Sequence, residues 1–416
     1  MDDKKRDVII IGGGVVGVCI AYYTALEGAS VLLLEKGRVG CGSSYGNAGL
    51  LVPSQCIPLP SPGVIAQGVR YLFDPGGPFY VRPRPDLELA RWFWRFCRCC
   101  NERHLHHSIG VFRKLNTESL ELHTELAAAG GSHYEFKQDG ILSLFIDDRE
   151  FSESLEYSSR VRIYGIETSV FSGKEIREME PSIGQKVVGG LLHRMDGCLD
   201  PAAFVSWLAG EAKSRGAVFL ENTEVFWLET DRRRVTKIVT THGDFTAEQV
   251  VLAGGAWNAQ LAGYLGTRIP IQAAKGYSLT FHPPKNAPKV PFLLEEARVA
   301  VTPYAESLRL AGTLELAGMD LGINRRRLET IQSRTFQYMP RLEIGEIKEI
   351  WRGLRPCTPD GLPILGRIRP YENALMAGGH GTKGMLLGPI TGKYICRMLG
   401  GESIGMLERS LKPNRF

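Results

Sequence analysis

The start of the chain alternates between apolar runs and glycine, in the order strand, turn, helix and strand. Residues 8–11 are uniformly apolar, which predicts a parallel strand buried on both faces. The glycine-rich run 12–17 follows, and the apolar residues 18–26 predict a helix. A second apolar strand, at about 30–34, ends in Glu35. This order predicts a βαβ unit at the start of an α/β fold.

Later segments carry patterns that predict a helix, a surface excursion and further strands. Asp200 and Pro201 predict the start of an amphipathic helix that reaches about residue 215, because aspartate caps a helix and proline suits its first turn. A proline-dense stretch, 58–85, predicts a long surface excursion. The predicted strands are 140–146, 276–281, 297–302 and 307–312, and a β-meander of 217–220, 225–230, 235–241 and 244–252 that leads back to the first sheet.

Length and composition narrow the class of protein. The 416 residues suffice for a large α/β domain and a second domain. A net charge of +5 is mild and gives no argument for nucleic acid. Nine cysteines without a repeating framework suit a reducing compartment. The first residues lack signal-peptide anatomy and no run approaches a spanning helix, so we expect a cytoplasmic enzyme.

The glycine-rich turn predicts dinucleotide binding. Gly12 permits the tight turn, Gly14 lets the backbone approach a pyrophosphate, and Gly17 lets helix and strand pack closely. The helix N-terminus, at Val15 and Val16, offers N–H groups and a positive dipole end to the phosphates. Glu35 is placed to accept hydrogen bonds from the ribose hydroxyls.

Three distant segments favour FAD over NAD, because an elongated flavin cofactor needs contacts along its whole length. Residues 42–50 are small and polar, residues 249–257 form a buried strand that runs into small residues, and residues 377–385 form a glycine-rich turn that opens a helix. The non-covalent FAD contacts predicted outside the first turn are Lys36, Ser43, Ser44, Asn47, Ala48, Gly49, Leu50, Gly254, Gly381, Thr382, Lys383, Gly384 and Met385.

Motifs along the whole chain resemble one known family. Besides the first turn, they are residues 43–49, 275–280, 353–361 and 379–384. The sequence resembles FAD-dependent D-amino-acid dehydrogenases of the small-subunit type, within the glycine oxidase/D-amino-acid oxidase superfamily. Members similar to it act on D-amino acids including D-proline, so the resemblance implies that cyclic imino acids such as D-proline or hydroxy-D-proline are substrates.

The resemblance implies an α/β fold of two interleaved domains. The first is a Rossmann-like FAD-binding domain of the glutathione-reductase type, and the second is a substrate domain built on a mixed β-sheet. By analogy, Val225 contacts the adenine through its backbone. The expected boundaries are 1–52, 196–268 and 352–416 for the FAD-binding domain, and 53–195 and 269–351 for the substrate-binding domain.

The implied reaction passes the α-hydrogen of an amino acid to the flavin as a hydride. Arg355 lies in the motif that supplies a carboxylate-binding arginine across the superfamily, and the alternative is a structural ion pair. Tyr277 adds a hydrogen bond to the same carboxylate or is a half-buried strand tyrosine. The turn 380–384 aims N–H groups and a helix dipole at the pyrimidine edge of the flavin, with Lys383 adding a full charge. His380 is a ring contact or a proton acceptor.

The sequence departs from the superfamily at one point and leaves two segments open. In the glycine-oxidase branch a tyrosine lies on the strand that corresponds to 299–303, where this chain has none. At helical spacing Cys97, Cys100, His104 and His107 share a face that suits zinc, but the resemblance implies no metal and we expect none. Residues 89–96 mix aromatic rings with arginines, which is typical of membrane interfaces or of a buried core.

Three functions therefore stand as hypotheses. The first is a D-amino-acid dehydrogenase that passes electrons to a quinone or a redox partner, in the cytoplasm or at the cytoplasmic face of the inner membrane. The second is an oxygen-using oxidase of D-amino acids, glycine or sarcosine. The third is a non-catalytic flavin subunit of a larger complex, against which the intact Arg355 motif counts.

Overall fold

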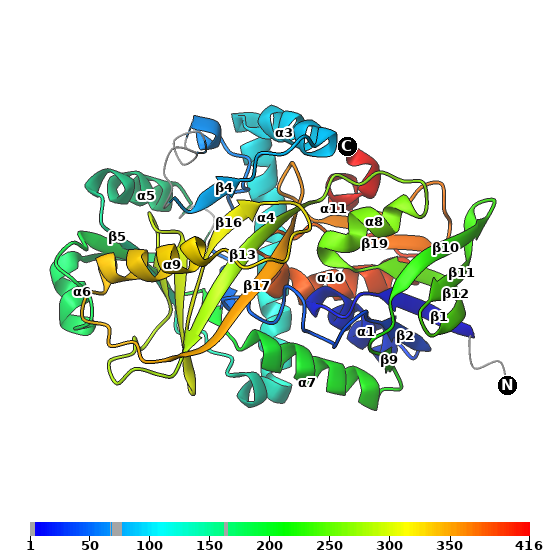
Figure 1. Cartoon of the computed structure of the whole chain (residues 1–416), viewed down its shortest axis with the longest axis horizontal. Coiled ribbons are helices and arrows are strands. Elements are labelled where there is room, and N and C mark those ends of the chain that lie inside the picture. Colours follow the sequence, from blue (N-terminus) through cyan, green and yellow to red (C-terminus); the bar gives the residue numbers. More distant parts are fainter. Residues whose placement is uncertain (1–4, 67, 69–76, 162–164) are drawn as a thin grey trace.

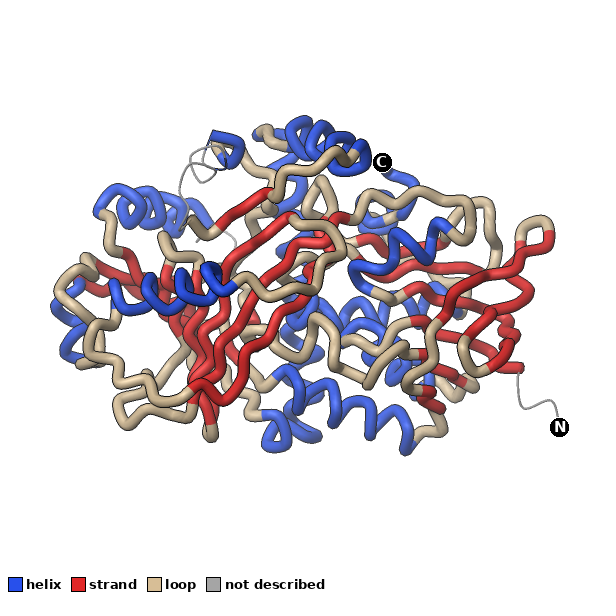
Figure 2. Tube along the Cα trace, viewed as in Figure 1, coloured by secondary structure: helices blue, strands red, loops and turns tan. Residues whose placement is uncertain are grey.

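The computed structural model describes residues 5–66, 68, 77–161 and 165–416. Their strands form two large sheets, one in each half of the elongated molecule, with helices packed around and between them (Figures 1 and 2). The first strand and the last long helix lie in the same half of the molecule, so segments from both ends of the chain build that half. This is the mixed α/β architecture expected from the sequence, and the exact domain boundaries stay a prediction.

The first sheet has the strand order β10-β11-β12-β1-β2-β9, with β19 added beside β12 and β18 beside β19. Its centre is parallel: β1 pairs with β2 and β12, β12 with β19, and β2 with β9. Both faces of β1 are buried, as its apolar run predicts. The strands are β1 (Lys5–Ile11), β2 (Val31–Leu34), β9 (Val218–Leu220), β10 (Val225–Asp231), β11 (Arg234–Thr240), β12 (Gly243–Leu252), β18 (Ile364–Arg367) and β19 (Ala374–Gly378).

Two helices pack against this sheet: α1 (Val15–Leu26) and α10 (Gly384–Leu399). A side chain at Gly392 would overlap the backbone of Cys19, so glycine there allows the two helices to approach closely. A third helix, α7 (Pro201–Ser214), begins as predicted, because the Asp200 carboxylate accepts a hydrogen bond from Ala203 N. The shorter elements of this half are α8 (Asn258–Gly263), α11 (Leu407–Leu411), η3 (Gly255–Trp257) and η4 (Pro413–Arg415).

The second sheet has the order β17-β13-β16-β15-β14-β5-β7-β6, with β4 paired to β16. The predicted strands at 140–146, 276–281, 297–302 and 307–312 appear in it as β5, β13, β15 and β16. Its strands are β4 (Phe79–Val81), β5 (Ile141–Phe145), β6 (Thr168–Ser172), β7 (Gly189–His193), β13 (Gln272–Phe281), β14 (Phe292–Leu294), β15 (Val299–Tyr304), β16 (Ser307–Leu316) and β17 (Ile347–Cys357). Its helices are α5 (Asp148–Val161), α6 (Gly173–Met179) and α9 (Arg325–Tyr338).

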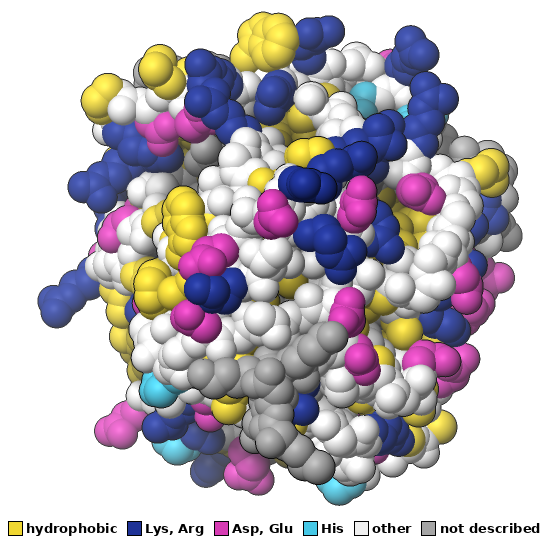
Figure 3. All heavy atoms as spheres, turned by 90° about the vertical axis from the view of Figure 1, so that its right-hand side faces the viewer, with side chains coloured by type: hydrophobic (Ala, Val, Ile, Leu, Met, Phe, Trp, Pro, Cys, Tyr) yellow, Lys and Arg dark blue, Asp and Glu magenta, His cyan; other side chains and the backbone are white. Residues whose placement is uncertain are grey.

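Two helices connect the halves: α3 (Leu87–Cys99) along the upper edge of the molecule and α4 (Glu102–Gly130) through its middle (Figure 1). Hydrophobic side chains lie among Lys and Arg side chains along that upper edge (Figure 3). The chain breaks between the two helices at Asn101, whose side chain caps α4 by accepting from His104 N. This break corrects the expectation of one helical face that carries Cys97, Cys100, His104 and His107.

The remaining elements are short. The proline-dense stretch 58–85 includes helical residues at 64–66 and strand β4, while residues 67 and 69–76 of that prediction lie outside the described residues. In the part of the chain that the structure describes, no helix is long and apolar enough to cross a membrane. The other short elements are β3 (Leu50–Leu51), β8 (Gly197–Cys198) and η1 (Gly131–Tyr134).

Candidate active site

A continuous cavity of about 1410 Å³ runs from the carboxyl ends of the first sheet to the inner face of the second. Its volume exceeds that of a site for one drug-sized ligand, as a site for a dinucleotide and a substrate requires. Most of the predicted site residues line it: Gly12, Gly14, Val15, Val16, Glu35, Lys36, Ser43, Ser44, Asn47, Ala48, Leu50, Val225, Gly254, Arg355, His380, Gly381, Thr382, Lys383, Gly384 and Met385. Gly17, Gly49 and Tyr277 are not among its lining residues.

The nucleotide end is built by the first turn and α1. Gly12 has φ +117°, and a Cβ there would lie 2.6 Å from the carbonyl oxygen of Ala253, so both the backbone and the space require glycine. A Cβ on Gly17 would overlap the carbonyl of Gly12, which gives Gly17 the packing role that the sequence predicts. The first turn of α1 therefore lies at the cavity, which Val15 and Val16 line.

Glu35 closes this end of the cavity. Its two carboxylate oxygens accept hydrogen bonds from Gly13 N at 2.7 Å and Gly37 N at 2.8 Å. These bonds fix the carboxylate beside the glycine turn, and each oxygen keeps a further lone pair for a ribose hydroxyl. The Lys36 ammonium lies 3.6 Å from the centre of the Trp257 ring, and both residues line the cavity.

Two hydrogen bonds and one close packing contact hold the segment 43–50 in place. Ser44 Oγ accepts from Val15 N at 2.9 Å, which ties the segment to the start of α1. Ser43 Oγ donates to the Leu354 carbonyl at 2.6 Å. Gly49 has φ +73°, and a side chain there would overlap the Leu199 carbonyl, so Gly49 shapes the turn in place of the cofactor contact expected from the sequence.

A tyrosine that the sequence reasoning missed supports the same segment. β15 extends one residue beyond 299–303, to Tyr304, whose hydroxyl donates to the Ala48 carbonyl at 2.9 Å. Thr302 Oγ1 donates to the same oxygen at 2.8 Å. Tyr304 therefore holds the cofactor-facing loop from behind and is not among the residues that line the cavity.

The turn before α10 forms another part of the cavity wall. Gly381 N donates to the Pro356 carbonyl at 2.8 Å, so this N–H is engaged within the protein and does not face a ligand. The first-turn N–H groups of α10, from Gly384 onward, have no acceptor inside their own helix and lie at the cavity wall. This is the arrangement of donors that stabilises negative charge on a bound group.

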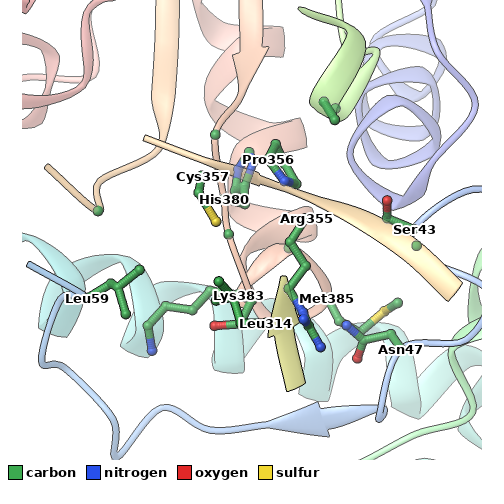
Figure 4. Close-up of a pocket in the computed structure, with 18 of the residues that line it drawn as sticks. Ser43, Asn47, Leu59, Leu314, Arg355, Pro356, Cys357, His380, Lys383 and Met385 are labelled. Atoms are coloured by element: carbon green, nitrogen blue, oxygen red, sulfur yellow. The ribbon is translucent and has the colours of Figure 1, made fainter. Parts of the chain in front are cut away.

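His380 and Lys383 are held more firmly than the sequence suggests. His380 Nε2 lies 2.9 Å from Thr391 Oγ1, and burial lowers the pKa of His380 to about 4, so the imidazole is neutral at pH 7. The Lys383 ammonium donates to the Gln55 carbonyl, and burial lowers its pKa. Lys383 thus directs its charge toward the loop at residue 55, and Figure 4 shows its side chain extending toward Leu59.

Arg355 projects into the cavity from the end of β17 (Figure 4). One guanidinium nitrogen donates to the Thr313 carbonyl at 2.7 Å, and the group lies over Gly276, where any side chain would overlap it. Partial burial lowers the pKa of Arg355, and among the described residues no Asp or Glu pairs with it. A half-buried guanidinium that faces a cavity without a carboxylate partner indicates a site for an anionic ligand.

Tyr277 does not join Arg355. Successive side chains of a strand point to opposite faces, and Gly276 is the residue of β13 that faces Arg355. Tyr277 therefore points the other way, is fully buried, and donates to Glu315 Oε2 at 2.8 Å. The carboxylate contact expected for Tyr277 is corrected to a structural hydrogen bond inside the second sheet.

Two buried polar side chains that the sequence did not single out position the cavity walls. Asn258 accepts from Gly254 N at 2.7 Å and donates to the Ala377 carbonyl at 3.0 Å, which joins the ends of β12 and β19. Asp196 accepts from Ser54 Oγ at 2.6 Å, and burial raises the pKa of Asp196 to about 7. Neither residue lies in a recognisable sequence motif. Each acts through a partner more than a hundred residues away in the chain, and the sequence alone does not identify that partner.

The arrangement fits FAD along the whole cavity. The glycine turn and the α1 N-terminus suit the pyrophosphate, Glu35 and the backbone at Val225 suit the adenosine, and the α10 N-terminus suits the electron-rich edge of a flavin. Among the described residues no group of three His, Cys, Asp or Glu side chains is placed to hold a metal ion.

Known proteins resemble the chain over its full length. A D-amino acid dehydrogenase of Vibrio atlanticus is 31% identical over 99% of this chain and 100% of its own. A D-amino-acid oxidase of Bradyrhizobium diazoefficiens is 29% identical over 99% of both chains. The crystal structure of glycine oxidase from Geobacillus kaustophilus shares the fold, with a TM-score of 0.80, 24% identity and 99% coverage of both chains.

The structure of an L-proline dehydrogenase from P. horikoshii shares the fold too, with a TM-score of 0.75 and 23% identity over 99% of this chain and 98% of its own. A family model described as DAO, FAD dependent oxidoreductase, matches residues 7–398. The cavity that fits FAD and the match over nearly the whole chain agree: the protein belongs to the DAO family of FAD-dependent oxidoreductases.

Proposed function

We propose that the protein is a D-amino-acid dehydrogenase, which oxidises the amino acid at its α-carbon and passes the electrons to an acceptor other than oxygen. The observation that carries the proposal is the unpaired guanidinium of Arg355 inside the cofactor cavity. Relatives named D-amino acid dehydrogenase, from Vibrio atlanticus and Helicobacter pylori, support the substrate class. We place the enzyme in the cytoplasm or at the cytoplasmic face of the inner membrane.

The chain's own residues have a defined task in this reaction. Arg355 holds the substrate carboxylate through paired charge-assisted hydrogen bonds, while its bond to the Thr313 carbonyl fixes the plane of the guanidinium. Bound FAD supplies the hydride acceptor. Burial lowers the pKa of His380 to about 4, so its imidazole is a weak proton acceptor, and we infer that the amine binds in its neutral form and needs no base from the protein.

The test is anaerobic reduction of the purified flavoprotein by a panel of D- and L-amino acids that includes both prolines and hydroxy-D-proline. We expect bleaching by D-amino acids, slow reoxidation in air and rapid turnover with an artificial dye. Arg355→Ala should raise the apparent KM about a hundredfold while flavin content is unchanged, because hydrogen bonds to a charged group contribute about 1.5–3 kcal/mol. An unchanged KM would remove Arg355 from the site, and no bleaching by any amino acid would refute the proposal.

A second function is an oxidase, which the relative from Bradyrhizobium diazoefficiens named D-amino-acid oxidase favours. The same preparation separates the two functions. Stoichiometric peroxide release in air at the rate of substrate oxidation would assign the oxidase, whereas dye-dependent turnover without peroxide assigns the dehydrogenase.

A further inference from the structure

The stretch of cavity wall formed by residues 45–48 is held from behind by side chains of the second sheet. One guanidinium nitrogen of Arg309 donates to the Asn47 carbonyl at 2.8 Å and to the Tyr45 carbonyl at 3.3 Å. The Ala48 carbonyl accepts from two hydroxyl groups of β15. None of these donor side chains is among the residues that line the cavity, so the three carbonyls point away from it.

Arg309 carries a buried charge without a counter-ion. It lies on β16 in a cross-strand row with Thr280 of β13 and Thr302 of β15, and its Nε donates to Thr280 Oγ1 at 3.2 Å. The side chain of Arg309 is 6% exposed, the oxygen atoms that it contacts are neutral, and no Asp or Glu of the described ranges forms an ion pair with it. A buried cation of this kind is costly unless negative charge lies near it, which points to an anionic group on the other side of the wall.

The bound carbonyls decide where the N–H groups of the wall point. A peptide unit is planar and trans, so its N–H points opposite to its C=O. The N–H groups of Gly46 and Ala48 belong to the two peptides whose carbonyls bind Arg309, so they point toward the cavity that both residues line. Within the described part of the chain neither N–H has an acceptor, whereas the N–H groups of the alternate residues 45, 47 and 49 donate inside the segment 42–49.

These two donors lie near the place where substrate and flavin must meet. Ser43 Oγ donates to the Leu354 carbonyl, and Gly46 packs against the Trp351 ring, so the segment runs beside the end of β17. Arg355, which follows Leu354 directly, projects from that end into the cavity (Figure 4). Buried N–H groups without a protein acceptor at this position indicate that a ligand accepts from them.

We propose that Arg309 is a positioning residue that raises the reduction potential of the bound flavin. It turns the peptides of residues 45–48 so that two N–H groups face the flavin, and it places a positive charge behind them. Fixed donors and a nearby cation stabilise the negative charge that a flavin gains when it takes a hydride. The inference concerns the bound cofactor alone, so it applies to a dehydrogenase and to an oxidase.

The test compares the flavin with a reference dye of similar potential while the purified holoenzyme is slowly reduced without air. Arg309→Gln keeps an amide donor and removes the charge, so the ratio of reduced to oxidised flavin at half-reduction of the dye should fall about tenfold or more. Arg309→Lys keeps the charge, and its ratio should stay within about threefold of the wild type. Arg326→Gln, at an exposed arginine of α9, removes the same net charge and is the matched control.

Tm and flavin content are measured on the same samples, because a merely structural role would lower both and leave the ratio unchanged in the molecules that keep FAD. That result would overturn the proposal, as would equal losses in Arg309→Gln and Arg309→Lys, or a loss of the same size in Arg326→Gln. Arg309→Met is a second neutral variant of similar length and should show the same fall if Arg309→Gln does not retain FAD. The measurement needs no amino acid, so its outcome is independent of the anaerobic bleaching that tests the proposed dehydrogenase function.

Discussion

Substitution of Gly276 by alanine tests whether the position of Arg355 sets catalytic efficiency. The nearest atoms to a Cβ at this residue all belong to the Arg355 guanidinium, and the Cβ would overlap them. The pairing of β13 with β16 is irregular beside Gly276, but Gly276 pairs with Gly353 of β17 and has no positive φ, so alanine fits its backbone. The substitution therefore displaces the end of a flexible side chain and leaves the sheet in place.

The structure sets the size of the effect. The displaced guanidinium loses its 2.7 Å hydrogen bond to the Thr313 carbonyl and its alignment with the substrate carboxylate. A hydrogen bond to a charged group contributes about 1.5–3 kcal/mol. Because about 1.4 kcal/mol corresponds to a factor of ten in rate, kcat/KM should fall about tenfold to a hundredfold. FAD content and Tm should stay close to those of the wild type.

The assay is dye-coupled turnover of the best D-amino acid, with Tm and flavin absorbance measured in parallel. Gly210→Ala is the matched control, because a Cβ at this position on α7 meets open space and should leave kcat/KM unchanged. A value of kcat/KM for Gly276→Ala within twofold of wild type would refute the claim that Gly276 seats the guanidinium. A large drop in Tm would refute the claim that the sheet tolerates the change.

Three further predictions concern the cofactor and the walls of its cavity. Glu35→Gln should weaken FAD binding about tenfold, because the carboxylate that accepts from Gly13 N and Gly37 N is replaced by an amide with one acceptor oxygen. Flavin release is measured by fluorescence, and an unchanged FAD affinity would contradict this prediction. Asn258→Ala should lower the free energy of unfolding by about 1–3 kcal/mol, since buried partners on β12 and β19 lose their hydrogen bonds; denaturant unfolding checks it. Burial raises the pKa of Asp196 from 3.8 to about 7. Between pH 3.8 and about pH 7 the folded protein therefore keeps a proton that the unfolded chain has released, and the free energy of unfolding falls as pH rises through this range. Asp196→Asn should flatten the fall in Tm between pH 5 and pH 7, and an unaltered slope would count against the burial of its charge.

Local patterns predicted much of the cofactor half. The buried strand β1, the glycine turn and α1 follow from an apolar run, from the requirement for positive φ at Gly12, and from the close approach at Gly17. The start of α7 follows from the Asp200 cap and Pro201. These features depend on residues near one another in the chain, so the sequence carries them directly.

The sites that were predicted less well depend on strand register. Tyr277 and Gly276 are neighbours, and the sequence marked the tyrosine, yet pairing of Ala274 with Arg355 turns Gly276 toward the guanidinium and Tyr277 away from it. A shift of one residue exchanges the two faces of a strand, and only the assembled sheet fixes the register. Tyr304 was missed because β15 continues to Tyr304, two residues beyond the predicted strand 297–302.

By itself, the sequence determined that this chain binds FAD through its first βαβ unit and carries an arginine suited to a carboxylate, because glycine turns and charged motifs act over short spans. Only the tertiary structure decided that Arg355 has no acidic partner among the described residues, that it lies over Gly276, and that one cavity joins the ends of the first sheet to the second sheet. Burial, pairing and cavity shape arise where segments hundreds of residues apart meet. They are properties of the packed chain and of no single segment.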